Sequence, residues 1–168
     1  MIIRNERPED SEAVRRVNED AFGRTAEADL VQTLHAAGAI ICSLVADEAG
    51  DVVGHILFSP ATLDSHSDSF PVAALGPMAV LPQRQNGGVG SALVRAGLEA
   101  ARGAGYSLAI VLGHPGFYPR FGFCPSAPLG IRWDRDVPEE VFMVAELTPG
   151  ALTGAQGVVH YHPAFEAV

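Results

Sequence analysis

The fold is decided by residues 75–91, which read L-G-P-M-A-V-L-P-Q-R-Q-N-G-G-V-G-S. An apolar run that stops at Pro82 predicts a strand, and the glycines after it predict a tight turn. Residues 92–101 follow with leucine and valine at helical spacing, and Gly103 ends this pattern. The stretch therefore predicts a strand, a glycine-rich turn and the start of a helix.

A helix start of this kind is suited to an anion. The first backbone N–H groups of a helix have no partner inside it, and the helix dipole makes that end positive. Glycines let a phosphate approach the backbone closely. A nucleotide P-loop would need a lysine that the turn lacks, and the dinucleotide fingerprint fails where Leu93 stands instead of glycine. The pattern Q-x-x-G-x-G is met by Gln85, Gly88 and Gly90, although an ordinary helix start with glycines in its turn would look the same.

A second motif lies downstream, where residues 113–123 read G-H-P-G-F-Y-P-R-F-G-F. Together, the two motifs resemble the acyl-CoA-binding signature and the tyrosine segment of the GNAT superfamily of N-acetyltransferases. The forms L-G-P-x-A-V and G-H-P-x-x-Y-x-R-F-G-F are similar to those of one bacterial subgroup. Two motifs in this order are more specific than either one alone.

The resemblance implies an α/β (α+β) GNAT fold that forms a single acyltransferase domain over residues 1–168. Its mixed central sheet would have about six to seven strands flanked by helices, and would splay between the fourth and fifth strands. Proline inside a strand indicates an edge or a bulge, so Pro77 fits the bulge that GNAT folds carry next to this opening. The opening would admit the pantetheine arm of CoA.

The resemblance also implies the reaction, which is direct transfer of an acetyl group from acetyl-CoA to a primary amine in a ternary complex. The alternative is a non-catalytic acyl-CoA-binding or sensor protein on the same fold. The residues expected to hold the coenzyme are Met78, Ala79, Val80, Gln85, Asn86, Gly87, Gly88, Val89, Gly90, Ser91 and His114.

Two catalytic roles follow from the resemblance. The Val80 N–H is expected to bind the carbonyl oxygen as it becomes negative, and Tyr118 is expected to protonate the departing thiolate. A tyrosine among phenylalanines would otherwise be read as a core residue. The asparagine that often precedes the tyrosine in the family is absent, which leaves the coenzyme contact of His114 open. The general base is also open among His55, His114, Glu27 and a chain of waters.

Composition limits the partners. The formal net charge of -9 excludes a nucleic-acid surface and favours a small-molecule or peptide amine as acceptor. No apolar run reaches membrane-spanning length, and the N-terminus does not read as a signal peptide. Cys42 and Cys124 lie in apolar sequence and are expected to be reduced, which indicates a cytoplasmic protein. The run His160-Tyr161-His162 lacks a third ligand at a suitable spacing, so no metal site is predicted.

The remaining elements follow from periodicity and turn residues. Residues 60–69 are polar and predict a loop, and 125–138 predict an irregular segment. Glu27 and His35 lie in the helix pair that borders the acceptor pocket in GNAT enzymes, and a strand near the C-terminus would permit a homodimer. The predicted helices span 8–22 and 26–37, and a further strand is predicted to start at 121–124. The other predicted strands span 2–4, 39–46, 52–59, 72–80, 107–112, 141–147 and 157–161.

Overall fold

The structure is a computed structural model that describes residues 1–168, and it is built on one mixed sheet of nine strands. The strands follow one another in the order β1-β2-β3-β4-β5-β8-β6, while β9 pairs with both β3 and β7. The strands are β1 (Ile2–Asn5), β2 (Cys42–Glu48), β3 (Asp51–Asp64), β4 (Ser69–Val80), β5 (Leu108–Leu112), β6 (Cys124–Pro125), β7 (Ile131–Trp133), β8 (Phe142–Glu146) and β9 (Gly157–His160).

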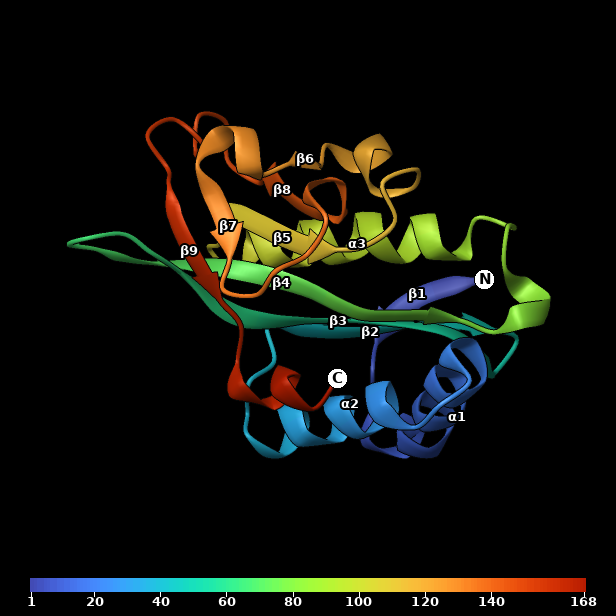
Figure 1. Cartoon of the computed structure of the whole chain (residues 1–168). Helices are drawn as coiled ribbons and strands as arrows, with labels where there is room; N and C mark the ends of the chain where they lie inside the picture. Colours follow the sequence, from blue (N-terminus) through green and yellow to red (C-terminus); the bar gives the residue numbers. More distant parts are fainter.

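Helices cover both faces of the sheet (Figure 1). The helices α1 (Ser11–Phe22) and α2 (Ala26–Ala36) lie on one face together with the C-terminal turn, and α3 (Val89–Gly103) lies on the other face. Helix α1 buries Val14 and Val17 and exposes its charged side, as an amphipathic helix on a sheet should. None of these helices is both long and apolar enough to cross a membrane.

Close packing between α3 and the sheet depends on Gly97. A Cβ built on this residue would lie 2.3 Å from Cε1 of Phe58, whose side chain is fully buried on β3. Gly97 therefore leaves the space into which the Phe58 ring fits, and it draws the helix close to the sheet.

The bulge predicted at Pro77 is present in β4. The register places Met78 opposite Ile56 and Leu75 opposite Phe58, so Gly76 and Pro77 together face a single residue of β3. A two-against-one count of this kind bends the strand and increases its twist.

The bulge also marks the place where β4 leaves β5. The two strands are parallel and pair only from Ala73–Ala109 to Leu75–Val111. Strand β4 then continues to Val80 without a neighbour on that side, and Figure 1 shows it extending past the end of β5. The predicted splay between the fourth and fifth strands is therefore confirmed.

The prediction of a loop over 60–69 is wrong. Strand β3 continues to Asp64 and β4 begins at Ser69, so the two strands form one long hairpin. Ala61 and Leu63 are buried together with Val159 of β9 and with Leu108 and Ile110 of β5, which the local sequence does not reveal. Pro60 is tolerated because on one side of β3 the pairing with β2 ends at Phe58 and the pairing with β9 begins at Thr62. The count of nine strands exceeds the predicted six to seven because the short strands β6, β7 and β9 also join the sheet.

Candidate active site

The turn between β4 and α3 presents a row of unpaired backbone donors. The N–H groups of residues 86–91 have no acceptor within the protein, and the first bond of the helix runs from the Ala92 N–H to the Gly88 carbonyl at 3.0 Å. Asn86 and Gly88 adopt left-handed backbone angles, with φ of 64° and 91°. The resulting concave row of donors at a helix start is suited to an anion such as a phosphate.

Gln85 joins this turn to the end of β4. Its Nε2 donates to the Val80 carbonyl at 3.0 Å, and its own N–H donates weakly to Pro82 at 3.4 Å. The structure thus places the Gln85 side chain as a bridge between turn and strand. The sequence had suggested only that it lies beside the anion.

A backbone hydrogen bond just after β4 fixes the direction of the Val80 peptide groups. The Leu81 N–H donates to the Val53 carbonyl on β3 at 2.9 Å. Because successive residues of a strand direct their N–H groups to opposite sides, the N–H groups of Val80 and Met78 face the splay, where no strand pairs with them.

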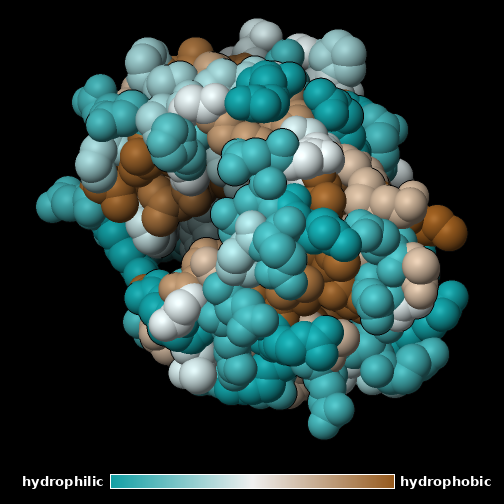
Figure 2. Space-filling model, turned by 90° about the vertical axis from the view of Figure 1, so that its right-hand side faces the viewer, coloured by the Kyte–Doolittle hydropathy of each residue, from teal (hydrophilic) through white to brown (hydrophobic).

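A cavity of about 470 Å³ occupies the splay. It is lined by the edge of β4, the end of β5, the segment that follows β5, helix α2 and the C-terminal segment. Figure 2 shows the side of the molecule that carries the turn after β4, where hydrophobic side chains lie in recesses between hydrophilic ones. The lining residues are Phe22, Arg24, Glu27, Leu30, Leu75, Gly76, Pro77, Met78, Val111, Leu112, Gly113, His114, Phe117, Tyr118, Trp133, Arg135, Tyr161, Phe165 and Val168.

Tyr118 lies in the wall of this cavity and not simply in the core. Its ring packs edge-on against Phe117 and Phe123, with centroids 5.0 and 5.8 Å away. Burial raises the pKa of Tyr118 to about 12 from an ordinary value of 10.0. The phenol is therefore protonated over the physiological range and is available as a proton donor.

His55 does not reach the cavity. Its side chain is fully buried, with Nδ1 3.2 Å from the Asn18 amide nitrogen and Nε2 2.8 Å from Ser43 Oγ. Burial lowers the pKa of His55. Both ring nitrogens are held by neighbours from other elements, so the side chain ties α1, β2 and β3 together.

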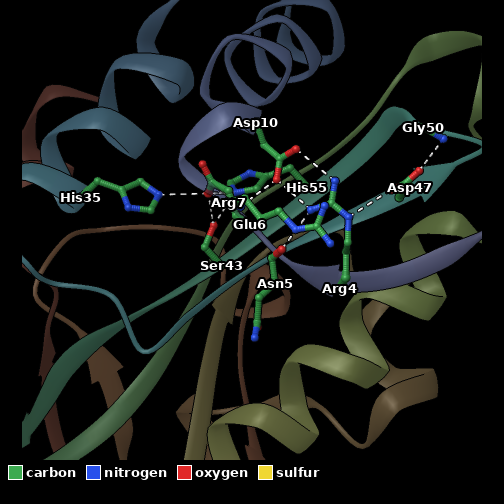
Figure 3. A network of polar contacts seen from close by, with 10 residues as sticks. All are labelled: Arg4, Asn5, Glu6, Arg7, Asp10, His35, Ser43, Asp47, Gly50 and His55. Carbon is green, nitrogen blue, oxygen red and sulfur yellow. Dashed lines mark hydrogen bonds and ion pairs between the residues drawn. The ribbon is translucent and has the colours of Figure 1, made fainter.

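Glu6 extends this network to the surface (Figure 3). Its Oε1 accepts from Ser43 at 2.5 Å and lies 3.0 Å from His35 Nε2 and 3.6 Å from His55 Nε2. Burial alone would raise the pKa of Glu6, but the neighbouring His55 and the hydrogen bond from Ser43 lower it to about 2. His35 and Glu6 line a separate cavity of about 570 Å³ between α1 and α2, whereas Glu27 lines the cavity in the splay.

Two of the candidate bases do line the splay. Glu27 is buried at the start of α2 and is held by Arg24 through bonds of 2.9 and 2.5 Å. His114 accepts a hydrogen bond at Nδ1 from the Gly116 N–H at 2.9 Å, which leaves Nε2 free. The structure thus brings Glu27, His114 and Tyr118 to one cavity and leaves His55 outside it.

The sequence reasoning missed the aromatic wall of the cavity. Trp133 of β7 and Tyr161 after β9 have ring centroids 5.4 Å apart, and Phe165 packs edge-on against Tyr161 at 4.8 Å. The Tyr161 hydroxyl and Trp133 Nε1 are buried without hydrogen-bond partners, and burial raises the pKa of Tyr161. No local motif marks these residues, because the parallel pairing of β7 with β9 is what brings them together.

The histidines beside Tyr161 have structural partners. His160 Nδ1 lies 3.1 Å from Asp134, and His162 Nδ1 accepts from the Ala164 N–H at 3.0 Å. Neither cysteine lines the cavity. Burial raises the pKa of Cys42 to about 11, whereas Cys124 is exposed, so the apolar surroundings expected for Cys124 are wrong.

Comparison with known proteins gives the family. The acetyltransferase (GNAT) domain family matches residues 2–125. The protein named uncharacterized N-acetyltransferase YjhQ of Escherichia coli strain K12 is 41% identical over 86% of this chain and 84% of its own length. Another from that strain, named uncharacterized N-acetyltransferase YhbS, is 34% identical over 98% of both chains.

Solved structures agree with the fold. The crystal structure of E. coli YhbS in complex with CoA has a TM-score of 0.91 and 33% identity, and covers 98% of this chain and 91% of its own. A GNAT family acetyltransferase from Brucella melitensis in complex with acetyl-CoA has a TM-score of 0.79 and 38% identity, and covers 98% of this chain and 97% of its own. From the splayed sheet, the donor row before α3 and these relatives together, it follows that this chain belongs to the GNAT family of acetyltransferases.

Proposed function

We propose that this protein transfers the acetyl group of acetyl-CoA to a primary amine by direct attack in a ternary complex. One observation carries the proposal. The unpaired donors of residues 86–91 lead onto the unpaired edge of β4 at Met78 and Val80, and this edge opens into the cavity that holds Tyr118. The related proteins solved with CoA or acetyl-CoA support acetyl-CoA as the co-substrate. CoA carries a thiol and both cysteines of the chain are free, which fits the reducing conditions of the cytoplasm.

The coenzyme would lie across these donors. Its pyrophosphate would accept hydrogen bonds from the N–H groups between Asn86 and Ser91 at the positive end of α3. Its pantetheine amides would pair with Met78 and Val80 as an added strand along the free edge of β4. Ala79 lies between these two residues, so the arm would run past it. His114, on the far side of the splay, would border the pantetheine arm.

The chemical step requires three groups around the thioester. The amine nitrogen forms a bond to the carbonyl carbon, and the carbonyl oxygen becomes negative. The Val80 N–H would stabilise this oxygen, an interaction worth about 3 kcal/mol in comparable sites. The C–S bond then breaks and the thiolate takes a proton from Tyr118. The amine loses its proton to a base in the cavity, and the phenolate regains a proton from solvent after the products leave.

The proton from the amine needs an acceptor on the other side of the cavity. Glu27 and His114 Nε2 both line it, and a chain of waters leading to either of them would serve as well. His55 is left out of this role, because its ring nitrogens bond to Asn18 and Ser43 away from the cavity.

Two measurements test the proposal. Isothermal titration with CoA should give a measurable heat, and acetyl-CoA with a panel of primary amines should release free thiol. Heat without thiol release from any amine would favour the non-catalytic coenzyme-binding alternative. The absence of both would overturn the proposal.

A further inference from the structure

We propose that Trp133, Arg135 and Tyr161 form a carboxylate-binding end of the acceptor cavity, so that the acceptor is a small amine that also carries a carboxylate, such as an apolar amino acid. The choice of an amine as acceptor rests on the proposed function. The binding of a carboxylate does not depend on that choice, because it follows from the polar groups in the cavity wall.

The first observation is a pair of buried polar groups without partners. The Tyr161 hydroxyl and Trp133 Nε1 are both excluded from solvent and form no hydrogen bond, while both residues line the cavity. Leaving such a group unpaired costs about 1–3 kcal/mol, so native structures seldom retain one unless something completes it. The indole nitrogen can only donate, and a hydroxyl readily donates. The missing partner is therefore a hydrogen-bond acceptor.

The second observation is a guanidinium group at the same place. The Arg135 guanidinium carbon lies 4.9 Å from the centre of the Trp133 ring, and the Trp133 and Tyr161 ring centroids are 5.4 Å apart. Arg135 is partly buried and has no carboxylate within ion-pairing distance, although the chain contains 20 acidic residues. A guanidinium matches a carboxylate with two parallel hydrogen bonds, which gives the missing acceptor a negative charge.

The remaining walls of the cavity define the rest of the acceptor. Phe165 and Leu30 provide apolar surface, and the Glu27 carboxylate, which is paired with Arg24, keeps lone pairs that can accept a hydrogen bond from an amine. A molecule with a carboxylate at one end, an apolar body and an amine therefore matches the charges of the cavity. Tyr118 and Tyr161 line the same cavity, so a carboxylate held by Tyr161 shares that cavity with the proposed site of transfer.

Trp133 provides a direct readout, because it is the only tryptophan in the chain. Its fluorescence should be titrated in the presence of CoA with L-phenylalanine, L-phenylalaninamide and phenethylamine. All three probes have the same aromatic ring and an amine. Only L-phenylalanine has a carboxylate, which is an amide in L-phenylalaninamide and is absent from phenethylamine. We expect L-phenylalanine to bind at least about tenfold more tightly than the other two, as charge-assisted hydrogen bonds would require.

Variants show which residue causes the difference. Arg135→Gln should remove the preference for L-phenylalanine, and Arg135→Lys should restore part of it. Tyr161→Phe keeps the ring and should weaken L-phenylalanine alone. Arg132→Gln is the matched control, because Arg132 is the arginine three residues earlier in the chain, is exposed and does not line the cavity. Equal binding of all three probes, or an equal loss for all three in Arg135→Gln, would overturn the inference.

The outcomes separate this inference from the proposed function. A carboxylate preference in fluorescence without thiol release would uphold the binding site and reject the transferase activity. Thiol release at similar rates from L-phenylalanine and phenethylamine would uphold the activity and reject the carboxylate site.

Discussion

The ring of Tyr118 lies directly over the α-carbon of Gly113. A Cβ built on Gly113 would lie 2.3 Å from Cε2 and 2.7 Å from Cδ2 of the tyrosine, a distance that real structures do not allow. The glycine at the end of β5 therefore determines where the phenol sits in the cavity. The first residue of the motif G-H-P-x-x-Y therefore has to be glycine, because a larger residue would clash with the tyrosine ring.

Replacement of this glycine should impair catalysis without removing the tyrosine. We expect Gly113→Ala to displace the ring and lower kcat by about 100-fold, the loss that a shift of roughly 1 Å in a catalytic group can cause. The thiol-release assay measures kcat, and Gly103→Ala is the control because nothing lies within 4 Å of its Cβ position. A Gly113→Ala enzyme with the parent kcat would show that the position of Tyr118 does not matter.

Removal of the phenol hydroxyl should be more selective. Tyr118→Phe is expected to lower kcat by about 10²–10⁴-fold, because it removes the proposed proton donor and retains the ring. Binding of CoA, measured by calorimetry, should not change. Tyr106→Phe serves as the control, since Tyr106 is partly buried against the core and does not line the cavity. A loss of CoA affinity equal to the loss of kcat would instead indicate a structural role.

The pH dependence of the reaction follows from the raised pKa of Tyr118. A proton donor is active below its pKa, so the shift from 10.0 to about 12 moves the loss of activity on the alkaline side above pH 10. With saturating amine, kcat should rise as the amine loses its proton and then stay level at least to pH 10. A falling limb below pH 10 that disappears in Tyr118→Phe would contradict this expectation.

Acid stability should depend on Glu6. A carboxylate whose folded pKa is lowered from 4.5 to about 2 stabilises the protein above the unfolded pKa, and this contribution is lost as the pH falls between those values. We expect Glu6→Gln to lower the free energy of unfolding by about 2 kcal/mol at pH 7, which is less than the full shift corresponds to because solvent screens this partly exposed group, and to have almost no effect near pH 2. Urea unfolding at several pH values measures this difference.

The control for this experiment is Glu9→Gln, which removes an exposed carboxylate from the same segment of chain. It should leave the unfolding free energy close to that of the parent at each pH. A Glu6→Gln deficit that stays constant from pH 7 to pH 2 would show that the loss comes from packing and not from charge.

Local sequence predicted the parts of the site that local geometry builds. Residues 75–91 form the predicted strand, turn and helix start, and Pro77 correctly indicated the bulge. The polar stretch 60–69 did not reveal a hairpin, because its buried side chains are covered by β9 from the far end of the chain. For the same reason Trp133 and Tyr161 were missed as cavity residues, since only the pairing of β7 with β9 brings them together. His55 looked like a candidate base from residue type alone, and burial against Asn18 and Ser43 places it elsewhere.

Because β4 separates from β5 beyond Leu75, one edge of β4 lacks backbone hydrogen-bond partners inside the protein. If the coenzyme pairs with that edge, the free energy of unfolding becomes coupled to the supply of CoA. A CoA concentration 100 times the Kd would raise the free energy of unfolding by about 2.7 kcal/mol. Deuterium uptake at Met78 and Val80 should then slow when CoA is added, and equal uptake with and without it would argue against the coupling. The lifetime of the folded chain would in that case follow the metabolic state of its surroundings.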